Sequence, residues 1–124
     1  MTVHQQPIHA HLIRRVPEQF SWIDQRLVQQ RYIDQLSHPA AVLYLFLVTV
    51  GDNRGLSYYG DKTLCKRLQM DTSTLVEARS CLIRRQLVAY RDPLYQVLAL
   101  DCRKEAAVVD QGVSSIGQIL QQLG

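Results

Sequence analysis

The side chains best suited to binding chemistry lie between Asp61 and Arg91. Seven positive residues stand against three negative ones in this stretch, an excess of four, whereas the whole chain carries a net charge of only +3. The positive residues are Lys62, Lys66, Arg67, Arg79, Arg84, Arg85 and Arg91. Lysine and arginine neutralise phosphate groups, and the short hydroxyls of Thr72–Thr74 can donate hydrogen bonds to the same groups. The segment therefore predicts binding to a polyanion.

Other kinds of chemistry lack a matching set of residues. His4, His9 and His11 are metal-ligand types, but they lie in a proline-containing segment without periodicity, where nothing would hold their geometry. We therefore predict no metal site and no cofactor. The chain contains no Ser/His/Asp set, no paired carboxylates and no glycine-rich phosphate loop, so we predict that it is not an enzyme.

The cysteines predict reduced thiols. Cys65, Cys81 and Cys102 are an odd number and form no CxxC pair, which argues against a disulfide framework or a zinc ribbon. A redox switch between Cys65 and Cys81 across two helices is an alternative. Small buried thiols are the more common arrangement.

Length and hydropathy predict one compact domain. The chain has 124 residues, of which 47% are hydrophobic, enough for a single core. The longest apolar run, Ala40–Val50, is well short of the roughly 20 residues that span a bilayer. Met1–Gln6 lacks the basic and apolar regions of a signal peptide. We expect a cytoplasmic protein without membrane association.

We divide the chain into three parts. Residues 1–19 form an extended N-terminal arm that carries Arg14 and Arg15, and residues 20–100 form the folded domain. Residues 101–124 form a polar linker followed by a short amphipathic helix over 115–123. The apolar face of that helix consists of Ile116, Ile119, Leu120 and Leu123.

The first half of the domain is predicted to be helical. Apolar residues at spacings of three and four over Phe20–Leu36 predict one helix or two short ones, anchored to the core by Trp22, the sole tryptophan. Ser37 or His38 as N-cap, followed by Pro39 in the first turn, predicts the start of a second, apolar helix. Because this helix is apolar nearly all round, it should be covered on most sides.

The second half is predicted to alternate between helices and strands. The apolar helix should end at Gly51 in the left-handed conformation of a C-cap, and Leu56–Tyr59 should form a strand. Asp61 is expected to cap the next helix, and Met70–Ser73 to break it and cap the one after. That last helix, over Thr74–Gln86, would turn Leu75, Ala78 and Leu82 inward.

A β-hairpin is predicted to close the domain. Leu87–Tyr90 and Tyr95–Leu100 have the composition of strands, and Arg91–Leu94 that of the turn between them. The expected fold class is thus mainly α with a small β-hairpin wing, a winged helix-turn-helix.

Two segments also resemble a known family. Asp61–Leu75, with a Leu-x-x-x-Leu helix, a small polar turn and a Ser/Thr-rich helix start, resembles the helix-turn-helix of bacterial winged-helix regulators and of the amino-terminal domains of replication initiators and DnaD-like proteins. Arg79–Val88 resembles the end of their recognition helix and the entry into the wing. Gln69 and Gln86 replace glycines that many members carry, which predicts differently shaped turns. The wing turn holds only Arg91, which predicts a weak minor-groove contact.

The resemblance implies sequence-specific binding of double-stranded DNA. The inward stripe of the last helix leaves a mostly polar outer face, made of Ser73, Thr74, Val76, Glu77, Arg79, Ser80 and Arg84. Helices in the major groove read base edges, so we expect Arg79 to bind guanine with two hydrogen bonds, and Thr72–Thr74 to contact phosphates or bases. Glu77 would weaken phosphate contacts there. The predicted backbone contacts are Lys62, Lys66, Arg67 and Arg91.

The sequence leaves two hypotheses about function open. The first is a DNA-binding homodimer that acts as a transcriptional regulator or as a replication or mobile-element accessory factor. Its apolar contact would be residues 20–36 or 115–123. The second is a winged-helix adaptor that binds another protein and does not bind DNA.

Overall fold

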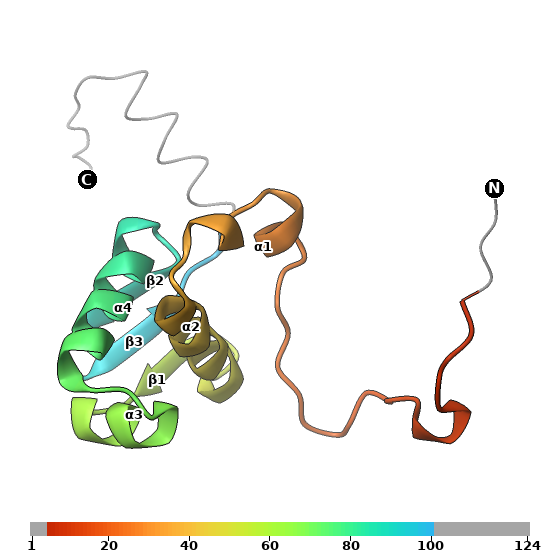
Figure 1. Cartoon of the computed structure of the whole chain (residues 1–124). Helices are drawn as coiled ribbons and strands as arrows, with labels where there is room; N and C mark the ends of the chain where they lie inside the picture. Colours follow the sequence, from red (N-terminus) through yellow and green to blue (C-terminus); the bar gives the residue numbers. More distant parts are fainter. Residues whose placement is uncertain (1–4, 101–124) are drawn as a thin grey trace.

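The computed structural model describes residues 5–100 of the chain. The predicted linker and amphipathic helix over 115–123 lie outside the described residues. Within them, the order of elements is 3₁₀ helix η1 (Ala10–Leu12), α1 (Arg26–Gln29), 3₁₀ helix η2 (Ile33–Gln35), α2 (His38–Val50), β1 (Leu56–Tyr58), α3 (Asp61–Leu68), α4 (Thr72–Arg84), β2 (Val88–Arg91) and β3 (Leu94–Val97). Figure 1 shows the helices packed in front of a small sheet, with the N-terminal arm running away from them.

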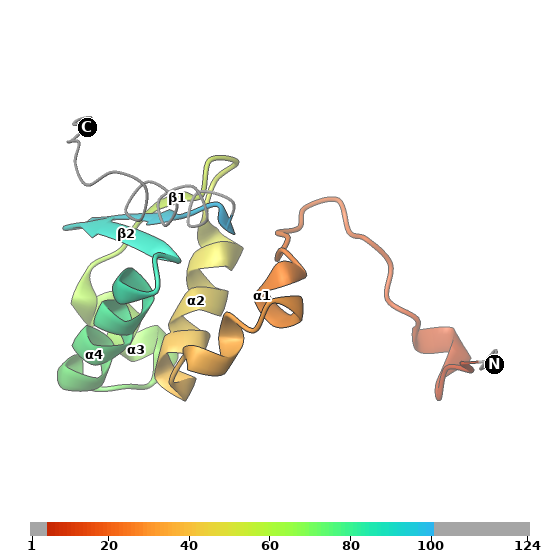
Figure 2. The ribbon, with the colours of Figure 1, turned by 90° about the horizontal axis from the view of Figure 1, so that it is seen from above.

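The predicted fold class is confirmed. The three strands form one antiparallel sheet in the order β1-β3-β2, with Ser57 opposite Tyr95 and Ala89 opposite Gln96. Helices α3 and α4 precede the β2–β3 hairpin, so the hairpin is the wing of a mainly helical, winged-helix arrangement. Figure 2 shows the sheet edge-on above the helices.

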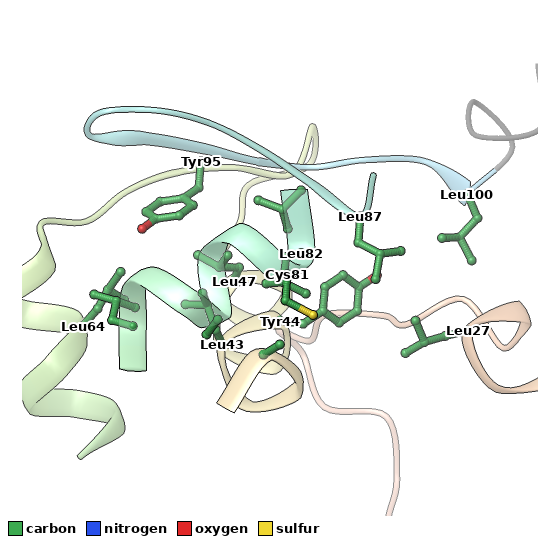
Figure 3. Packing of buried hydrophobic residues seen from close by; sticks show 14 residues of the cluster. Leu27, Leu43, Tyr44, Leu47, Leu64, Cys81, Leu82, Leu87, Tyr95 and Leu100 are labelled. Carbon is green, nitrogen blue, oxygen red and sulfur yellow. The ribbon is translucent and has the colours of Figure 1, made fainter. Parts of the chain in front are cut away.

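Helix α2 is the centre of the core. The Ser37 hydroxyl accepts a hydrogen bond from the backbone N–H of Ala40 at 3.2 Å, which confirms Ser37 as the N-cap. Leu43 and Leu47 are fully buried beneath the sheet and against α4. Figure 3 shows Tyr95 pointing from β3 toward the helices, above the leucines of α2 and α3. The opposite face of α2 is not covered within the described part of the chain.

The end of α2 differs from the prediction. Gly51 has φ −67° and ψ 149°, an extended conformation rather than the left-handed one expected of a glycine C-cap. The space at this position favours glycine instead, because a Cβ would lie 3.1 Å from the Leu47 carbonyl oxygen and 3.3 Å from the Gly55 Cα. The tight return of the chain into β1 therefore leaves little room for a side chain at Gly51.

The segment before α2 follows the second of the two predicted alternatives. It holds two short helical elements, α1 and the 3₁₀ helix η2, rather than one helix over residues 20–36. The Asp24 carboxylate accepts the backbone N–H of Arg26 at 2.9 Å just before α1, and Arg31, with a left-handed φ of 63°, follows the C-cap Gln30. Trp22 does not anchor the segment to the core, since 75% of its surface is exposed. Leu27 takes that role and is buried.

Helices α3 and α4 end with glutamine in a conformation that glycine favours. Gln69 has φ 55° and Gln86 has φ 59°. The N–H of Met70 bonds to the Cys65 carbonyl, and that of Leu87 to the Leu82 carbonyl, as in the Schellman motif. The prediction that these turns differ in shape from glycine-containing ones is therefore wrong.

Asp71 caps the helix that follows the first of these turns. Its carboxylate accepts the Thr74 N–H at 2.8 Å and the Ser73 hydroxyl at 3.1 Å. Bonds from the Thr74 side chain and backbone, and from Ser73, lower the pKa of this carboxyl below its ordinary 3.8. A lowered pKa in the folded state means that the carboxylate stabilises the fold above pH 3.8 and stops doing so as the pH falls through the folded-state value.

We expect Asp71→Ala to lower the melting temperature by a few degrees at neutral pH, because the first turn of α4 loses its cap. The difference from the natural chain should shrink as the pH falls below 3.8. Asp71→Asn is the matched control, because its amide oxygen keeps the cap without titrating. Thermal unfolding followed by circular dichroism across the acidic range measures both effects, and a pH-independent difference would contradict the assignment.

Candidate nucleic-acid interface

Helices α3 and α4 each pack against the core through one apolar face. Leu75, Ala78 and Leu82 of α4 are buried, as predicted, and Leu64 of α3 is buried beside them. The remaining faces of both helices point outward. Among the described elements, η2 lies beside one edge of the outer face of α4, where Cys81 contacts Gln35, and Ser73, Glu77 and Arg84 remain exposed.

Arg79 is the predicted site residue whose position differs most from expectation. Its Nη1 donates to Asp61 Oδ1 and to the Tyr95 hydroxyl oxygen, both at 2.8 Å, and its Nη2 lies 3.4 Å from Asp61 Oδ2. The guanidinium carbon also lies 4.3 Å from the centre of the Tyr90 ring, close enough for a cation–π contact. Arg79 therefore joins α3, α4 and both strands of the wing.

This position corrects the prediction that Arg79 reads guanine. A bidentate contact needs free guanidinium N–H groups directed at the base. Here the Nη donors are directed at Asp61 and Tyr95, and only 12% of the Arg79 side chain is exposed. The predicted capping role of Asp61 is wrong for the same reason. Gly60 is the N-cap of α3, and the Asp61 carboxylate binds Arg79 instead.

The electrostatics of the Arg79 cluster favour the charged arginine. Burial by itself would lower the pKa of Arg79, but the hydrogen bonds to Asp61 and Tyr95 outweigh it, and the pKa is raised. Burial raises the pKa of Tyr95, although the bond from Arg79 opposes that shift. The Tyr95 phenol therefore stays neutral at physiological pH, and its oxygen accepts the hydrogen bond that Arg79 donates.

The exposed face of α4 is nearly neutral. Thr72, Ser73, Glu77 and Arg84 are exposed, and Thr74 and Ser80 are half-buried. The two charges on this face, Glu77 and Arg84, are of opposite sign. A shallow groove of about 570 Å³ brings several of these residues together, lined by Gln35, Ser37, Val76, Glu77, Ser80, Cys81 and Arg84. Gln35 and Ser37 were not predicted as part of the site, because only the packing of η2 beside α4 places them there.

The predicted backbone contacts lie on α3 and the wing. Lys62 and Lys66 are exposed one turn apart on α3, and Arg91 is exposed at the end of β2. Arg67 is also exposed, but its guanidinium carbon lies 5.8 Å from the centre of the Phe46 ring on α2. Arg91 is followed by Asp92 and the cis peptide to Pro93, so positive and negative charges adjoin at the tip of the wing.

Two further side chains, Tyr59 and Cys81, contact neighbouring elements of the fold. Tyr59 packs edge-on against Phe46, with ring centres 5.1 Å apart, whereas Tyr58 is exposed. Cys65 and Cys81 are free thiols, and Cys81 Sγ donates a weak bond to the Gln35 carbonyl at 3.8 Å. Among residues 5–100, no three His, Cys, Asp or Glu side chains are grouped as metal ligands would be. None of the helices described is long and apolar enough to cross a bilayer.

Comparisons with known proteins add no relative to this description. No protein-family model, no curated protein and no solved structure matches this chain.

We expect Arg79→Ala to destabilise the fold, because it leaves Asp61 and Tyr95 without their shared partner. Removing one member of a buried ion pair costs about 3–5 kcal/mol, and solvent around the partly exposed Asp61 should reduce this to about 2–3 kcal/mol. Arg84→Ala, an exposed arginine of the same helix, is the control and should change stability by less than about 0.5 kcal/mol.

Urea unfolding of both variants measures the difference. A stable Arg79→Ala protein with altered base preference would show instead that Arg79 leaves the cluster and contacts DNA.

Proposed function

We propose that this protein binds double-stranded DNA by placing α4 in the major groove, with the lysines of α3 on the adjoining phosphates. The observation that carries the proposal is the uncovered polar face of α4 beside Lys62 and Lys66, on a helix pair whose angle is held by Arg79. An α-helix fits the width of the major groove, and lysines flanking it neutralise the backbone. The proposal includes membership of the winged-helix family and no catalytic step.

Phosphate contacts supply most of the affinity in this proposal. The four predicted contacts, Lys62, Lys66, Arg67 and Arg91, are all exposed, while the face of α4 itself contributes almost no net charge. Nonspecific attraction to DNA therefore comes from α3 and the wing, and α4 supplies discrimination between sequences.

Base discrimination falls on one carboxylate and on short or aliphatic side chains once Arg79 is assigned to the fold. Ser73, Val76, Glu77 and Ser80 lie at spacings of three and four on the outer face of α4. A carboxylate accepts a hydrogen bond from the cytosine amino group, and an aliphatic side chain packs on the thymine methyl group. We infer a target that contains cytosine opposite Glu77 and thymine beside Val76.

A protein adaptor is the second candidate, and one observation favours it. Val76 and Ile83 are both about 40% exposed on the outer face of α4, an apolar content that also suits a protein partner. Such an adaptor would bind no duplex at any salt concentration.

The cellular role proposed is that of a transcriptional regulator or a replication or mobile-element accessory factor. Both roles need a protein in the compartment that holds the DNA, which for a bacterial-type regulator is the cytoplasm. Both are also compatible with a homodimer on a two-fold symmetric target.

Salt dependence tests the proposal. Four phosphate contacts predict a slope of log Kobs against log salt of about −3.6 per protomer, so affinity should fall roughly 100-fold between about 50 and 200 mM salt. Lys66→Ala should reduce the slope by about one and weaken all duplexes equally. Arg54→Ala, an exposed arginine in the turn before β1, is the control and should leave the slope unchanged. Fluorescence anisotropy with a labelled duplex measures the slopes, and absence of binding at the lower salt would favour the adaptor.

Base preference tests the assignment of α4. Glu77→Gln should exchange a preference for cytosine for one for adenine at a single position, because a glutamine amide pairs with the adenine edge. Selection from a randomised duplex library, followed by sequencing, reads the preference of each variant. Glu18→Gln, in the exposed N-terminal arm, makes the same chemical change outside the interface and is the control. An unchanged preference in Glu77→Gln would remove this side chain from the base-reading set.

A further inference from the structure

The residues that precede α1 expose an unusual amount of apolar surface, and in this subsection Gln5–Ile23 is called the arm. Every described residue from Gln5 to Ile23 is exposed, and six large apolar side chains in this stretch have 60% or more of their surface in contact with solvent. They are Ile8, Leu12, Ile13, Val16, Phe20 and Trp22. An extended segment of this composition gains free energy only when another surface removes it from water.

A second exposed apolar surface lies on α2. Val42 and Leu45 are one turn apart on the side of α2 that faces away from the core, and 56% of Leu45 is exposed. The face carries no charged residue between Val42 and Thr49. We call this surface, made of Val42, Leu45 and Thr49, the outer face of α2.

The arm is attached at one end of this outer face. The Ser21 hydroxyl donates to the Thr49 carbonyl oxygen at 2.9 Å, and the Thr49 hydroxyl donates to the Leu45 carbonyl oxygen at 2.7 Å. From that attachment the arm runs away from its own helices rather than back across α2 (Figures 1 and 2). The apolar arm and the apolar helix face are thus neighbours in one chain without covering each other.

We propose that two copies of this chain exchange their arms, with the arm of each lying across the outer face of α2 of the other. One chain carries both the inserted segment and its receiving surface, which is what a closed two-fold interface needs. Each of the six arm side chains can bury on the order of 100 Å² of apolar surface. Together with the outer face of α2, the area buried on each partner approaches the roughly 800 Å² of a standard interface. The contact does not use α3 or the outer face of α4.

Self-association without DNA tests this contact independently of DNA binding. The full chain should pass from monomer to dimer between about 1 and 100 µM, a range expected of a modest apolar interface. Sedimentation equilibrium measures the mass. Trp22 is the only tryptophan, so its emission should move to shorter wavelength over the same concentration range as the arm becomes covered.

Two substitutions separate the two halves of the contact. Leu12→Glu changes the arm and Leu45→Glu changes the receiving face. Each should weaken the dimer at least tenfold, because a charge replaces a leucine that the dimer contact would bury. Neither side chain contributes to the core, so circular dichroism should show an unchanged fold. Tyr58→Glu, at an exposed position on β1, is the control and should leave the dimer intact.

Mixing the two variants provides the most specific test. In an equimolar mixture, the natural arm of the Leu45→Glu chain meets the natural α2 of the Leu12→Glu chain, so one of the two exchanged contacts is restored. The mixture should therefore dimerise more strongly than either variant alone. A chain that stays monomeric to about 100 µM, a dimer that both substitutions leave unchanged, or a Trp22 emission that does not depend on concentration would each overturn the proposal.

Discussion

The interaction on which the rest of the structure depends is the bonding of Arg79 to Asp61 and Tyr95. An arginine can donate hydrogen bonds in several directions at once. Here Arg79 connects the start of α3, the middle of α4 and strand β3. The ring of Tyr90 closes the cluster from the neighbouring strand. Helices of eight and thirteen residues share only a small apolar contact, so this polar connection holds the crossing of α3 and α4 and the position of the wing.

The same interaction determines what the outer surface can do. Because the central arginine of α4 is turned inward, the outer face of this helix retains one acid, one arginine near its end, and short or aliphatic side chains. Strong bidentate readout of guanine is therefore not available from Arg79, and discrimination would come from weaker contacts. In the proposed DNA complex, attraction to phosphates is left to Lys62 and Lys66 on the neighbouring helix. The proposal thus gives stability and recognition to different residues of neighbouring helices.

The N-terminal region places little of its apolar surface in the core. Residues 20–36 have helical spacing of apolar residues, but only Leu27 among them is a buried apolar side chain, with Tyr32 and Leu36 partly buried against the core. The α-helical part of the segment is a single turn, which the left-handed Arg31 follows. A short turn cannot bury a whole apolar stripe. The apolar residues before it, Trp22 among them, remain on the surface, and the outer face of α2 remains uncovered beside them.

The sequence by itself determined the local features, in which a signal and its effect lie within a few residues of each other. Ser37 and Asp71 are caps because their oxygens reach an N–H three residues on, and Leu75 and Leu82 are buried because helical spacing puts them on one side. Only the tertiary structure decided the partner of Arg79, since Asp61 and Tyr95 are 18 and 16 residues away along the chain. An arginine that reads a base and one that ties helices together have the same local sequence, and they differ only in which distant groups the fold brings within hydrogen-bonding distance.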